Sequence, residues 1–331
     1  MNVLVTGGTG FIGSNTCLEL IRADHKVVIV DNLYNSDVEV LDRIENITGV
    51  KPKFYLVDIL DKDRLEDVFK ENNFDAVIHF AGYKAVGESV EIPLTYYENN
   101  ISGSINLYNL MLKYKVHNLV FSSSATVYGD DFEVPFKEEY GMGHTTNPYG
   151  STKLINEMII SDFTKAEPDM SCIILRYFNP VGADETHQLG ENPKGIPNNL
   201  VPYIAQVVNG ERDYLRVWGN DYNTPDGTGV RDYIHVVDLA KAHVKAIEYA
   251  QHHKGCETIN IGTGKGYSVL EVLHAYEKAC GKTIPYKIME RRPGDIDICY
   301  ADTSKAKELL GFEAQYDIDK MCEDSYKFIC R

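Results

Sequence analysis

The sequence predicts an α/β protein: a doubly wound parallel sheet followed by a smaller C-terminal lobe of mixed strands and helices. Short apolar runs alternate with amphipathic helical segments along the first half of the chain, which is typical of parallel strands joined by crossover helices. The first apolar run leads through the glycine-rich stretch TGGTGFIGS (6–14) into a helical segment at 14–23. A strand, a glycine loop and a helix in this order predict a dinucleotide site.

The glycines of this loop explain how a dinucleotide would bind. Gly8, Gly10 and Gly13 match the glycine positions of the dinucleotide-binding fingerprint. Gly7, Gly10 and Gly13 give an alternative alignment to the same fingerprint. Glycine permits the tight turn and lets backbone N–H groups and the helix N-terminus approach a pyrophosphate. A glycine triplet by itself also fits an ordinary turn, so its surroundings must support the prediction.

A second apolar strand, at residues 26–30, ends in an acid that supports it. Asp31 follows Gly13 by eighteen residues, close to the offset of about 20 at which an acid contacts the adenosine ribose. A carboxylate there accepts hydrogen bonds from the ribose and repels a 2′-phosphate. We therefore predict NAD, and not NADP, as the cofactor; the alternative is that Asp31 only caps a strand.

Length and composition limit the possible functions. A chain of 331 residues predicts two lobes, placed at 1–178 and 179–331, with a return to the first lobe around 230–265. A net charge of −16 disfavours nucleic acid and acidic membranes as partners. No apolar run has transmembrane length and residues 1–6 enter the first strand directly, so we expect a cytoplasmic protein. Seven unpaired cysteines and scattered histidines predict reduced thiols and no metal site.

The remaining elements follow from hydrophobic periodicity. We predict strands at 53–57, 76–80, 118–122 and 171–176, and helices at 62–72, 93–114, 149–166, 200–209, 236–249 and 268–280. Ser268 and Glu271 form the capping-box pattern at the start of the last helix. The helix at 93–114 carries an apolar stripe that packs on the sheet or lies in an interface: Ile101, Ile105, Tyr108 and Leu112.

Three residues could carry chemistry together. Tyr149 and Lys153 are four apart on a predicted helix, so their side chains project from one face. A tyrosine with its ordinary pKa of about 10 is a poor base, but a nearby ammonium and an oxidised nicotinamide favour the phenolate. Ser124, at the end of a strand, could hydrogen bond the same substrate oxygen. Alone, the Tyr/Lys pair also fits a packed ring beside a solvated charge.

Together with GGTGFIG, these three residues resemble the Ser, Tyr and Lys triad of the extended short-chain dehydrogenase/reductase superfamily, which has a Rossmann fold. Within it, the chain resembles the UDP-galactose 4-epimerase (UDP-glucose 4-epimerase) family along nearly its entire length. The matching stretches are HFAGYKAVGESV (79–90), FSSSATVYGD (121–130), NPYGSTK (147–153), LRYFNPVGA (175–183), GIPNNLVPYIAQV (195–207), GTGVRDYIHVVDLA (227–240) and RRPGD (291–295).

The resemblance implies a role for each matching residue. Tyr149 would be the acid/base, Lys153 its electrostatic partner, which also reaches the nicotinamide ribose, and Ser124 the hydroxyl partner. Besides these three and the glycines, the implied NAD contacts are Phe11, Ile12, Asp31, Asn32, Asn35, Ser36, Asp58, Ile59, Phe80, Ala81, Gly82, Lys84, Asn99, Tyr177 and Phe178. Besides Ser124 and Tyr149, the implied UDP-sugar contacts are Asn179, Asn199, Leu200, Arg216, Val217, Trp218, Arg231, Tyr233, Arg292, Asp295 and Cys299.

The implied reaction inverts carbon 4 of a UDP-hexose. Tyr149 takes the 4-hydroxyl proton while hydride passes to NAD, and the 4-keto sugar then turns and takes the hydride back on its other face. Arg231 and Arg292 can neutralise the diphosphate inside an acidic protein. The alternative for these arginines is a surface pairing with Asp232 and Asp295.

Two other functions remain as alternatives. A nucleotide-sugar 4,6-dehydratase needs an extra acid and base beside the serine, where this chain has Ala125 and Thr126. A non-catalytic NAD-sensing protein usually loses the tyrosine or the lysine, and this chain has both.

The resemblance also implies substrate breadth and a homodimer. Relatives that favour UDP-galactose and UDP-glucose often have a bulky tyrosine at the position of Cys299, and a small residue is associated with N-acetylated sugars. We therefore expect UDP-GlcNAc and UDP-GalNAc as further substrates, unless Cys299 is only a buried hydrophobe and its neighbours close the pocket. The homodimer would form a four-helix bundle that includes the apolar stripe.

Overall fold

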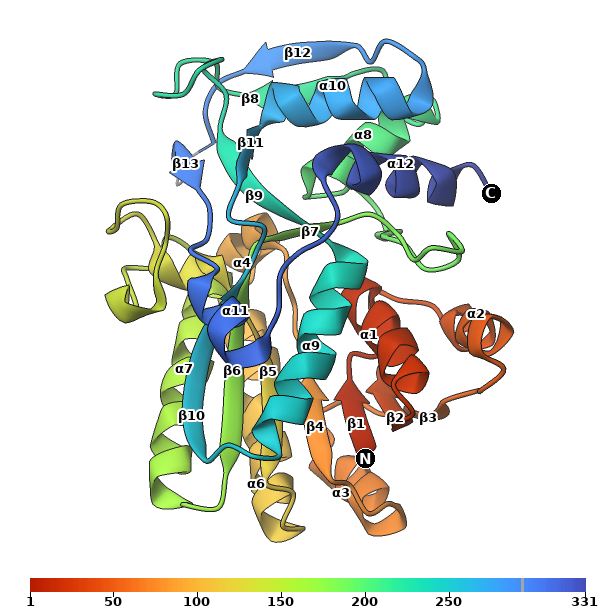
Figure 1. Ribbon diagram of the computed structural model, residues 1–331, viewed down its shortest axis with the longest axis vertical. Helices are drawn as coiled ribbons and strands as arrows, with labels where there is room; N and C mark the ends of the chain where they lie inside the picture. The colour runs from red at the N-terminus through yellow and green to blue at the C-terminus, as the bar shows by residue number, and fades with distance from the viewer. Residues whose placement is uncertain (293–294) are drawn as a thin grey trace.

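A computed structural model describes residues 1–292 and 295–331 and confirms the predicted fold class (Figure 1). Seven parallel strands form one sheet in the order β10-β6-β5-β4-β1-β2-β3. The strands are β1 (Asn2–Thr6), β2 (Lys26–Asp31), β3 (Lys53–Leu56), β4 (Ala76–His79), β5 (Asn118–Ser124), β6 (Ser171–Tyr177) and β10 (Gly255–Ile261). The strand order reverses between β1 and β4, and ligands bind at the carboxyl edge of such a switch point.

Helices cover both faces of this sheet, so its strands are buried on both sides (Figure 1). Val3 and Val5 of β1 point into one core and Leu4 points into the other, as the alternation of side chains along a strand requires. The first core contains side chains of α1 (Phe11–Arg22), α2 (Glu39–Thr48), α9 (Val236–Ala250) and α11 (Ser304–Leu310). The second contains side chains of α3 (Lys62–Glu71), α6 (Gly103–Lys113) and α7 (Pro148–Ala166).

The second lobe lies above the carboxyl edge of the large sheet (Figure 1). A small sheet joins β7 (Asn179–Val181), β9 (Val230–His235), β11 (Gly266–Ser268) and β13 (Ile298–Cys299), and β8 (Leu215–Trp218) pairs with β12 (Tyr286–Met289). Its helices are α8 (Leu200–Val208), α10 (Val269–Cys280) and α12 (Ile318–Ile329). The chain returns to the first lobe through α9, which packs on α1, and through β10, which pairs with β6.

The predicted capping box is present at the start of α10. The Ser268 hydroxyl oxygen accepts the backbone N–H of Glu271 at 3.1 Å, and the Glu271 carboxylate accepts the backbone N–H of Ser268 at 2.7 Å. Two orphan N–H groups at the helix start are thereby satisfied.

The predicted helix at 93–114 is divided in the structure. It consists of α5 (Pro93–Tyr97), a π-helical turn η1 (Glu98–Ser102) and α6, and it follows a short helix, α4 (Val86–Glu91), that the periodicity did not predict. The apolar stripe on it does not keep to one surface, because Tyr108 is only 4% exposed and its hydroxyl donates to Asn156 Oδ1 of α7 at 3.0 Å. Tyr108 is therefore a core residue, and the prediction that it contributes to an interface is wrong.

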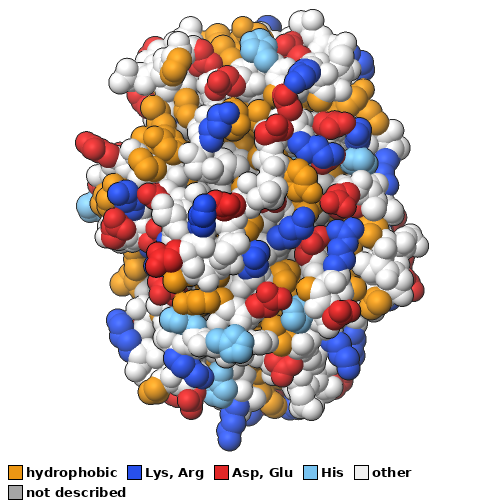
Figure 2. Space-filling model, viewed as in Figure 1, with side chains coloured by type: hydrophobic (Ala, Val, Ile, Leu, Met, Phe, Trp, Pro, Cys, Tyr) orange, Lys and Arg blue, Asp and Glu red, His pale blue; other side chains and the backbone are white. Residues whose placement is uncertain are grey.

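Acidic and basic side chains are interspersed over the face drawn in Figure 2. In the part of the chain that the structure describes, no helix is both long enough and apolar enough to cross a membrane.

Candidate active site

Two glycines of the loop, Gly7 and Gly13, leave no room for a side chain. Gly7 has a φ of +71°, and a Cβ on it would lie 2.8 Å from the backbone nitrogen of Ala81. A Cβ on Gly13 would lie 2.2 Å from the carbonyl oxygen of Gly7. Gly10 is the N-cap of α1, and in residues 1–292 and 295–331 no side chain caps this helix. The first N–H groups of α1 are thus available to bind an anion.

The residues predicted to bind adenosine meet at the carboxyl ends of β2 and β3. Asp31 is 9% exposed, and its carboxylate accepts the backbone N–H groups of Thr9 at 3.1 Å and Leu33 at 2.9 Å. The side-chain amide of Asn32 donates to Asp58 Oδ2 at 2.9 Å. A close-packed anion cradle beside an acid at the end of β2 fits NAD, with the pyrophosphate at α1 and the ribose at Asp31.

The three predicted catalytic side chains come together beside the end of β5. Tyr149 and Lys153 lie in the first turns of α7, which begins after Asn147, whose side chain accepts the backbone N–H of Gly150 at 2.8 Å. Lys153 Nζ lies 5.9 Å from the Tyr149 ring centroid. Ser124, the last residue of β5, is near enough to the Tyr149 side chain to lower its pKa. The strand end and the helix start therefore face each other with a phenol, a hydroxyl and an amine between them.

Burial shifts the pKa values of both ionisable groups. It raises the pKa of Tyr149 to about 12, which the hydrogen bond with Ser124 partly opposes. It lowers the pKa of Lys153 to about 8, which the negative charge of Glu157 partly opposes. Lys153 Nζ donates to the carbonyl oxygen of Ser122 at 2.6 Å, so the amine is fixed in place. Tyr149 needs additional positive charge beside it before it can serve as a base near neutral pH.

A buried ion pair behind the triad was not predicted. Glu157, one turn after Lys153, accepts the hydroxyl of Ser123 at 2.5 Å and pairs with Arg176 at 2.6 Å. Arg176 also donates to the carbonyl oxygen of Gly141 at 2.7 Å. This pair ties α7 to β5 and β6, and the spacing 149, 153, 157 on one helix face is the sequence signal that could have revealed it.

The amide of Asn100, in the π-helical turn, was also missed. Its Oδ1 accepts the backbone N–H of Tyr83 at 2.8 Å, and its Nδ2 donates to the Tyr83 carbonyl oxygen and to Thr152 Oγ1, both at 3.0 Å. Asn99, which was predicted, is 5% exposed and donates to Asn100 Oδ1 at 2.9 Å. The turn therefore fixes α7 against the 80–84 loop, and π-turns of this kind are frequent at functional sites.

Several predicted UDP-sugar residues surround one small cavity in the second lobe. Asn179, Asn199, Leu200 and Tyr233 line it, and Asn179 lies opposite Tyr233 where β7 pairs with β9. Ser124 lies opposite Tyr177 in the pairing of β5 with β6. Asn179, the first residue of β7, follows Tyr177 by two positions in the chain. The structure thus places the predicted nucleotide-sugar residue Asn179 just beyond the strand that pairs with the strand of Ser124.

The two predicted diphosphate arginines converge on Asp295. Arg231 Nη2 lies 3.6 Å from Asp295 Oδ1, and Arg292 Nε donates to Asp295 Oδ2 at 3.0 Å. The Arg292 guanidinium also lies 5.9 Å from the Trp218 ring centre. Asp232, the other acid considered as a partner, is fully buried and accepts hydrogen bonds from Thr263 instead. The arginines are therefore close enough together to share one anionic group.

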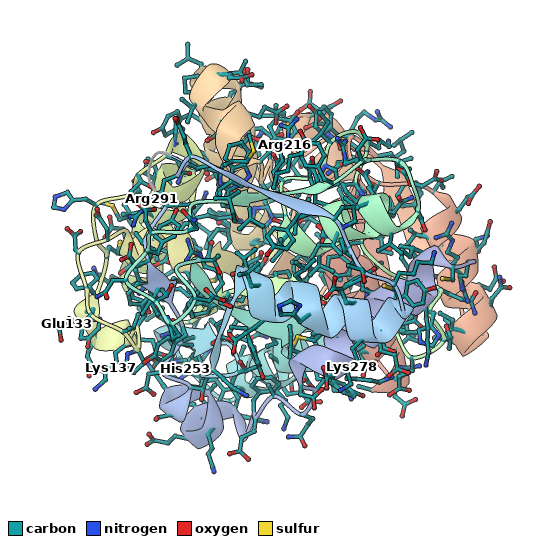
Figure 3. All side chains as sticks on the ribbon, turned by 90° about the horizontal axis from the view of Figure 1, so that it is seen from above. Glu133, Lys137, Arg216, His253, Lys278 and Arg291 are labelled. Atoms are coloured by element: carbon teal, nitrogen blue, oxygen red, sulfur yellow. The ribbon has the colours of Figure 1, made fainter. Side chains whose placement is uncertain are left out.

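Two predicted substrate residues do not present their side chains in this way. Val217 is 1% exposed and packs in the core of the second lobe, so only its backbone could face a ligand. Arg216 is exposed on β8, where it lies opposite Lys287 of β12 (Figure 3). Pro293 and Gly294 of the RRPGD stretch lie outside the described residues.

Cys299 lies in β13 and is 9% exposed. It belongs to one apolar cluster with Ala125, the residue after Ser124, and with Phe178, a predicted NAD contact. Burial raises the pKa of its thiol to about 12, so the thiol is neutral near pH 7. In residues 1–292 and 295–331, no group of three or more His, Cys, Asp or Glu side chains is arranged to hold a metal ion.

Comparison with known proteins confirms the predicted resemblance. Residues 3–262 match the model of the NAD dependent epimerase/dehydratase family. The chain is 54% identical to a UDP-glucose 4-epimerase of Bacillus subtilis over 99% of this chain and 96% of that protein. It is also 54% identical to the UDP-glucose 4-epimerase of Bifidobacterium longum, solved in complex with NAD+ and UDP, with a TM-score of 0.96 over 99% of this chain and 98% of that one.

A third similar structure is the UDP-glucose-4-epimerase of Stenotrophomonas maltophila with bound NAD and formylated UDP-arabinopyranose. It is 49% identical, with a TM-score of 0.97 over 100% of this chain and 98% of that one. Sequence motifs, sheet topology and site geometry agree with these comparisons: the chain belongs to the NAD dependent epimerase/dehydratase family.

Proposed function

We propose that this chain interconverts UDP-galactose and UDP-glucose by inverting carbon 4, with NAD as its cofactor. The observation that carries the proposal is the cluster of Ser124, Tyr149 and Lys153, at the carboxyl edge of the same sheet whose first strand leads into the glycine loop. The first lobe, 1–178, binds NAD, and the second, 179–331, binds the UDP-sugar. The relatives named UDP-glucose 4-epimerase support the same activity.

NAD is held by the loop after β1 and by the loops at the ends of β2 and β4. The N–H groups at the start of α1 bind its pyrophosphate, and Asp31 accepts hydrogen bonds from its adenosine ribose. Bound in this way, NAD would supply hydride transfer from carbon 4 of the sugar and back to its opposite face. Lys153 reaches the nicotinamide ribose and adds positive charge beside Tyr149.

Tyr149 takes the proton from the sugar 4-hydroxyl and later returns it. Burial alone holds the pKa of this phenol near 12, so positive charge from Lys153 and from the oxidised cofactor is what makes it a usable base. Ser124 hydrogen bonds the phenol and the reacting oxygen and guides the proton between them. Because the proton and the hydrogen both return, no net oxidation occurs.

The UDP group anchors the substrate while the hexose turns. Arg231 and Arg292 bind the diphosphate in place of their common partner Asp295, and Asn199 and Leu200 line the pocket beside it. Binding energy placed on the nucleotide and kept away from the hexose lets both faces of the sugar meet the cofactor.

The substrate range includes the N-acetylated pair, UDP-GlcNAc and UDP-GalNAc. The support is the small side chain of Cys299 in the cluster with Ala125 and Phe178, where a larger ring would occupy the space that an acetamido group needs. Ala125 and Thr126 offer no group that could protonate a leaving hydroxyl, which disfavours a 4,6-dehydratase.

The active form is a cytoplasmic homodimer. All seven cysteines are free, which fits a reducing compartment. Leu94 of α5, Ile105 of α6 and Met158 of α7 are 81%, 40% and 49% exposed, and they supply apolar surface on the helices expected in the bundle. Incubating the purified protein with UDP-galactose tests the proposed epimerase function. We expect UDP-glucose as the product. Loss of water from the sugar would favour a dehydratase, and an unchanged sugar would favour a binding protein.

A further inference from the structure

The segment 190–199 leads from the loop after β7 to the start of α8 and contacts the first lobe on the way. Lys194 Nζ donates to the carbonyl oxygens of Leu33 at 3.1 Å and Tyr34 at 3.4 Å. The Lys194 backbone N–H donates to Asn35 Oδ1 at 3.3 Å. All these partners lie in the loop after β2, which holds the residues expected to bind adenosine.

A second contact joins the same segment to the loop after β4. Glu191 is mostly buried, with 10% of its side chain exposed, and its Oε1 accepts from Lys84 Nζ at 3.1 Å. The same oxygen accepts from Asn199 Nδ2 at 3.0 Å. Lys84 belongs to the expected NAD contacts and Asn199 to the expected UDP-sugar contacts. One carboxylate oxygen therefore links the two ligand sites.

The loops after β2 and β4 also touch each other directly. The rings of Tyr34 and Tyr83 lie 4.7 Å apart between centroids, at an angle of 46°. The loops after β2 and β4 are thus connected to each other by an aromatic pair and by the segment 190–199.

The start of the segment is rigid and its middle is not part of a helix or strand. Asp184 Oδ1 accepts the backbone N–H of Leu189 at 2.5 Å, and Asp184 N–H donates to the Leu189 carbonyl oxygen at 2.9 Å. A Cβ on Gly190 would lie 2.4 Å from the Phe328 ring of α12, so the segment starts tightly against that helix. Residues 191–199, all described, form a loop between this turn and α8.

We propose that segment 190–199 is a cofactor latch, in which Lys194 and Glu191 are positioning residues that slow the release of NAD. The inference rests on the proposed NAD and UDP-sugar sites. NAD cannot leave the groove until Lys194 releases the loop after β2 and Glu191 releases Lys84. A nucleotide bound at Asn199 holds Glu191 in place, so an occupied UDP site slows NAD release further, and bound NAD reciprocally favours the nucleotide.

The release rate of NAD from the purified holoenzyme tests the latch without turnover. The enzyme is freed of unbound NAD, diluted, and sampled over time for the NAD that remains bound. Lys194→Ala and Glu191→Gln should release NAD roughly 3- to 10-fold faster than wild type, because each loses a charged hydrogen bond. The matched control is Lys70→Ala, which removes an exposed lysine paired with Asp67 on α3 at 2.7 Å and should release NAD at the wild-type rate.

Release at the control rate from both latch variants would overturn the proposal. A far-UV circular dichroism spectrum equal to that of the control separates a lost latch from a damaged fold. A wild-type protein that retains NAD but does not convert UDP-galactose would contradict the proposed function and leave the latch result valid.

Added UDP tests the link between the two sites. UDP should slow NAD release at least about 3-fold in wild type and in Lys194→Ala, and have little effect in Glu191→Gln, which keeps the shape of the side chain but loses its charge. An equal effect of UDP on Glu191→Gln and on wild type would show that Glu191 does not link the sites.

Discussion

At the scale of single residues, the proposed reaction depends on a tyrosine that burial keeps protonated. Burial raises the pKa of Tyr149 to about 12, and the ammonium of Lys153, 5.9 Å from the ring centroid, favours the phenolate. Lys153→Met should therefore raise the pKa of Tyr149 further and move the rising limb of the kcat/KM profile about one unit toward higher pH. An unchanged profile with weaker NAD binding would assign Lys153 to cofactor positioning alone.

A second residue-scale prediction concerns the size of the sugar pocket. Cys299→Tyr should lower kcat/KM on UDP-GlcNAc by roughly 5- to 150-fold, because overpacking costs about 1–3 kcal/mol. The rate on UDP-galactose, which has a hydroxyl in place of the acetamido group, should change little and serves as the control. Equal rates of wild type and variant on UDP-GlcNAc, or no rate for either, would contradict the proposed substrate range.

Some of these residues could be predicted and others could not, for a physical reason. Asp31, Tyr149 and Lys153 stand at fixed offsets from a strand or along one helix, so local geometry alone relates them to the site. Asn100 acts through hydrogen bonds to Tyr83 and Thr152, which only the folded chain brings together. No local pattern marks such a residue.

At the scale of elements, the exposed side of α5, α6 and α7 should form the dimer interface. Leu94 is 81% exposed, and a glutamate there would place a charge in an apolar contact. Light scattering at micromolar concentration should report a dimer for wild type and a monomer for Leu94→Glu. Val50→Glu, at an apolar residue 51% exposed after α2, should remain dimeric. A wild-type protein that is monomeric at this concentration would contradict the proposed homodimer.

Buried strands were the most predictable elements, because a parallel sheet covered on both faces requires short continuous apolar runs. The division of the predicted helix at 93–114 was not predictable. Its π-helical turn directs both Asn99 and Asn100 to the buried side, where they are 5% and 4% exposed. Hydrogen bonds to segments distant in sequence stabilise that turn. Helical periodicity cannot predict such bonds.

At the scale of the whole molecule, the two proposed ligand sites lie where the first and second parts of the chain contact each other. The change to Gly, Pro and Asn after residue 179 indicated the second lobe, and the net charge of −16 implies that an anionic ligand needs local cations. The contacts that join the lobes, such as Lys84 with Glu191, link residues 107 positions apart in the chain. Contacts between residues so far apart in the sequence depend on the tertiary fold and cannot be predicted from local sequence spacing.

The most direct test of the account is the conversion of UDP-galactose to UDP-glucose by NAD-loaded Tyr149→Phe compared with wild type. The variant keeps the ring and loses only the ionisable oxygen, so NAD and UDP should still bind while kcat falls by about 10² to 10⁴. A variant that binds both ligands and keeps more than about a tenth of the wild-type rate would contradict the role of Tyr149 as the acid and base of the reaction.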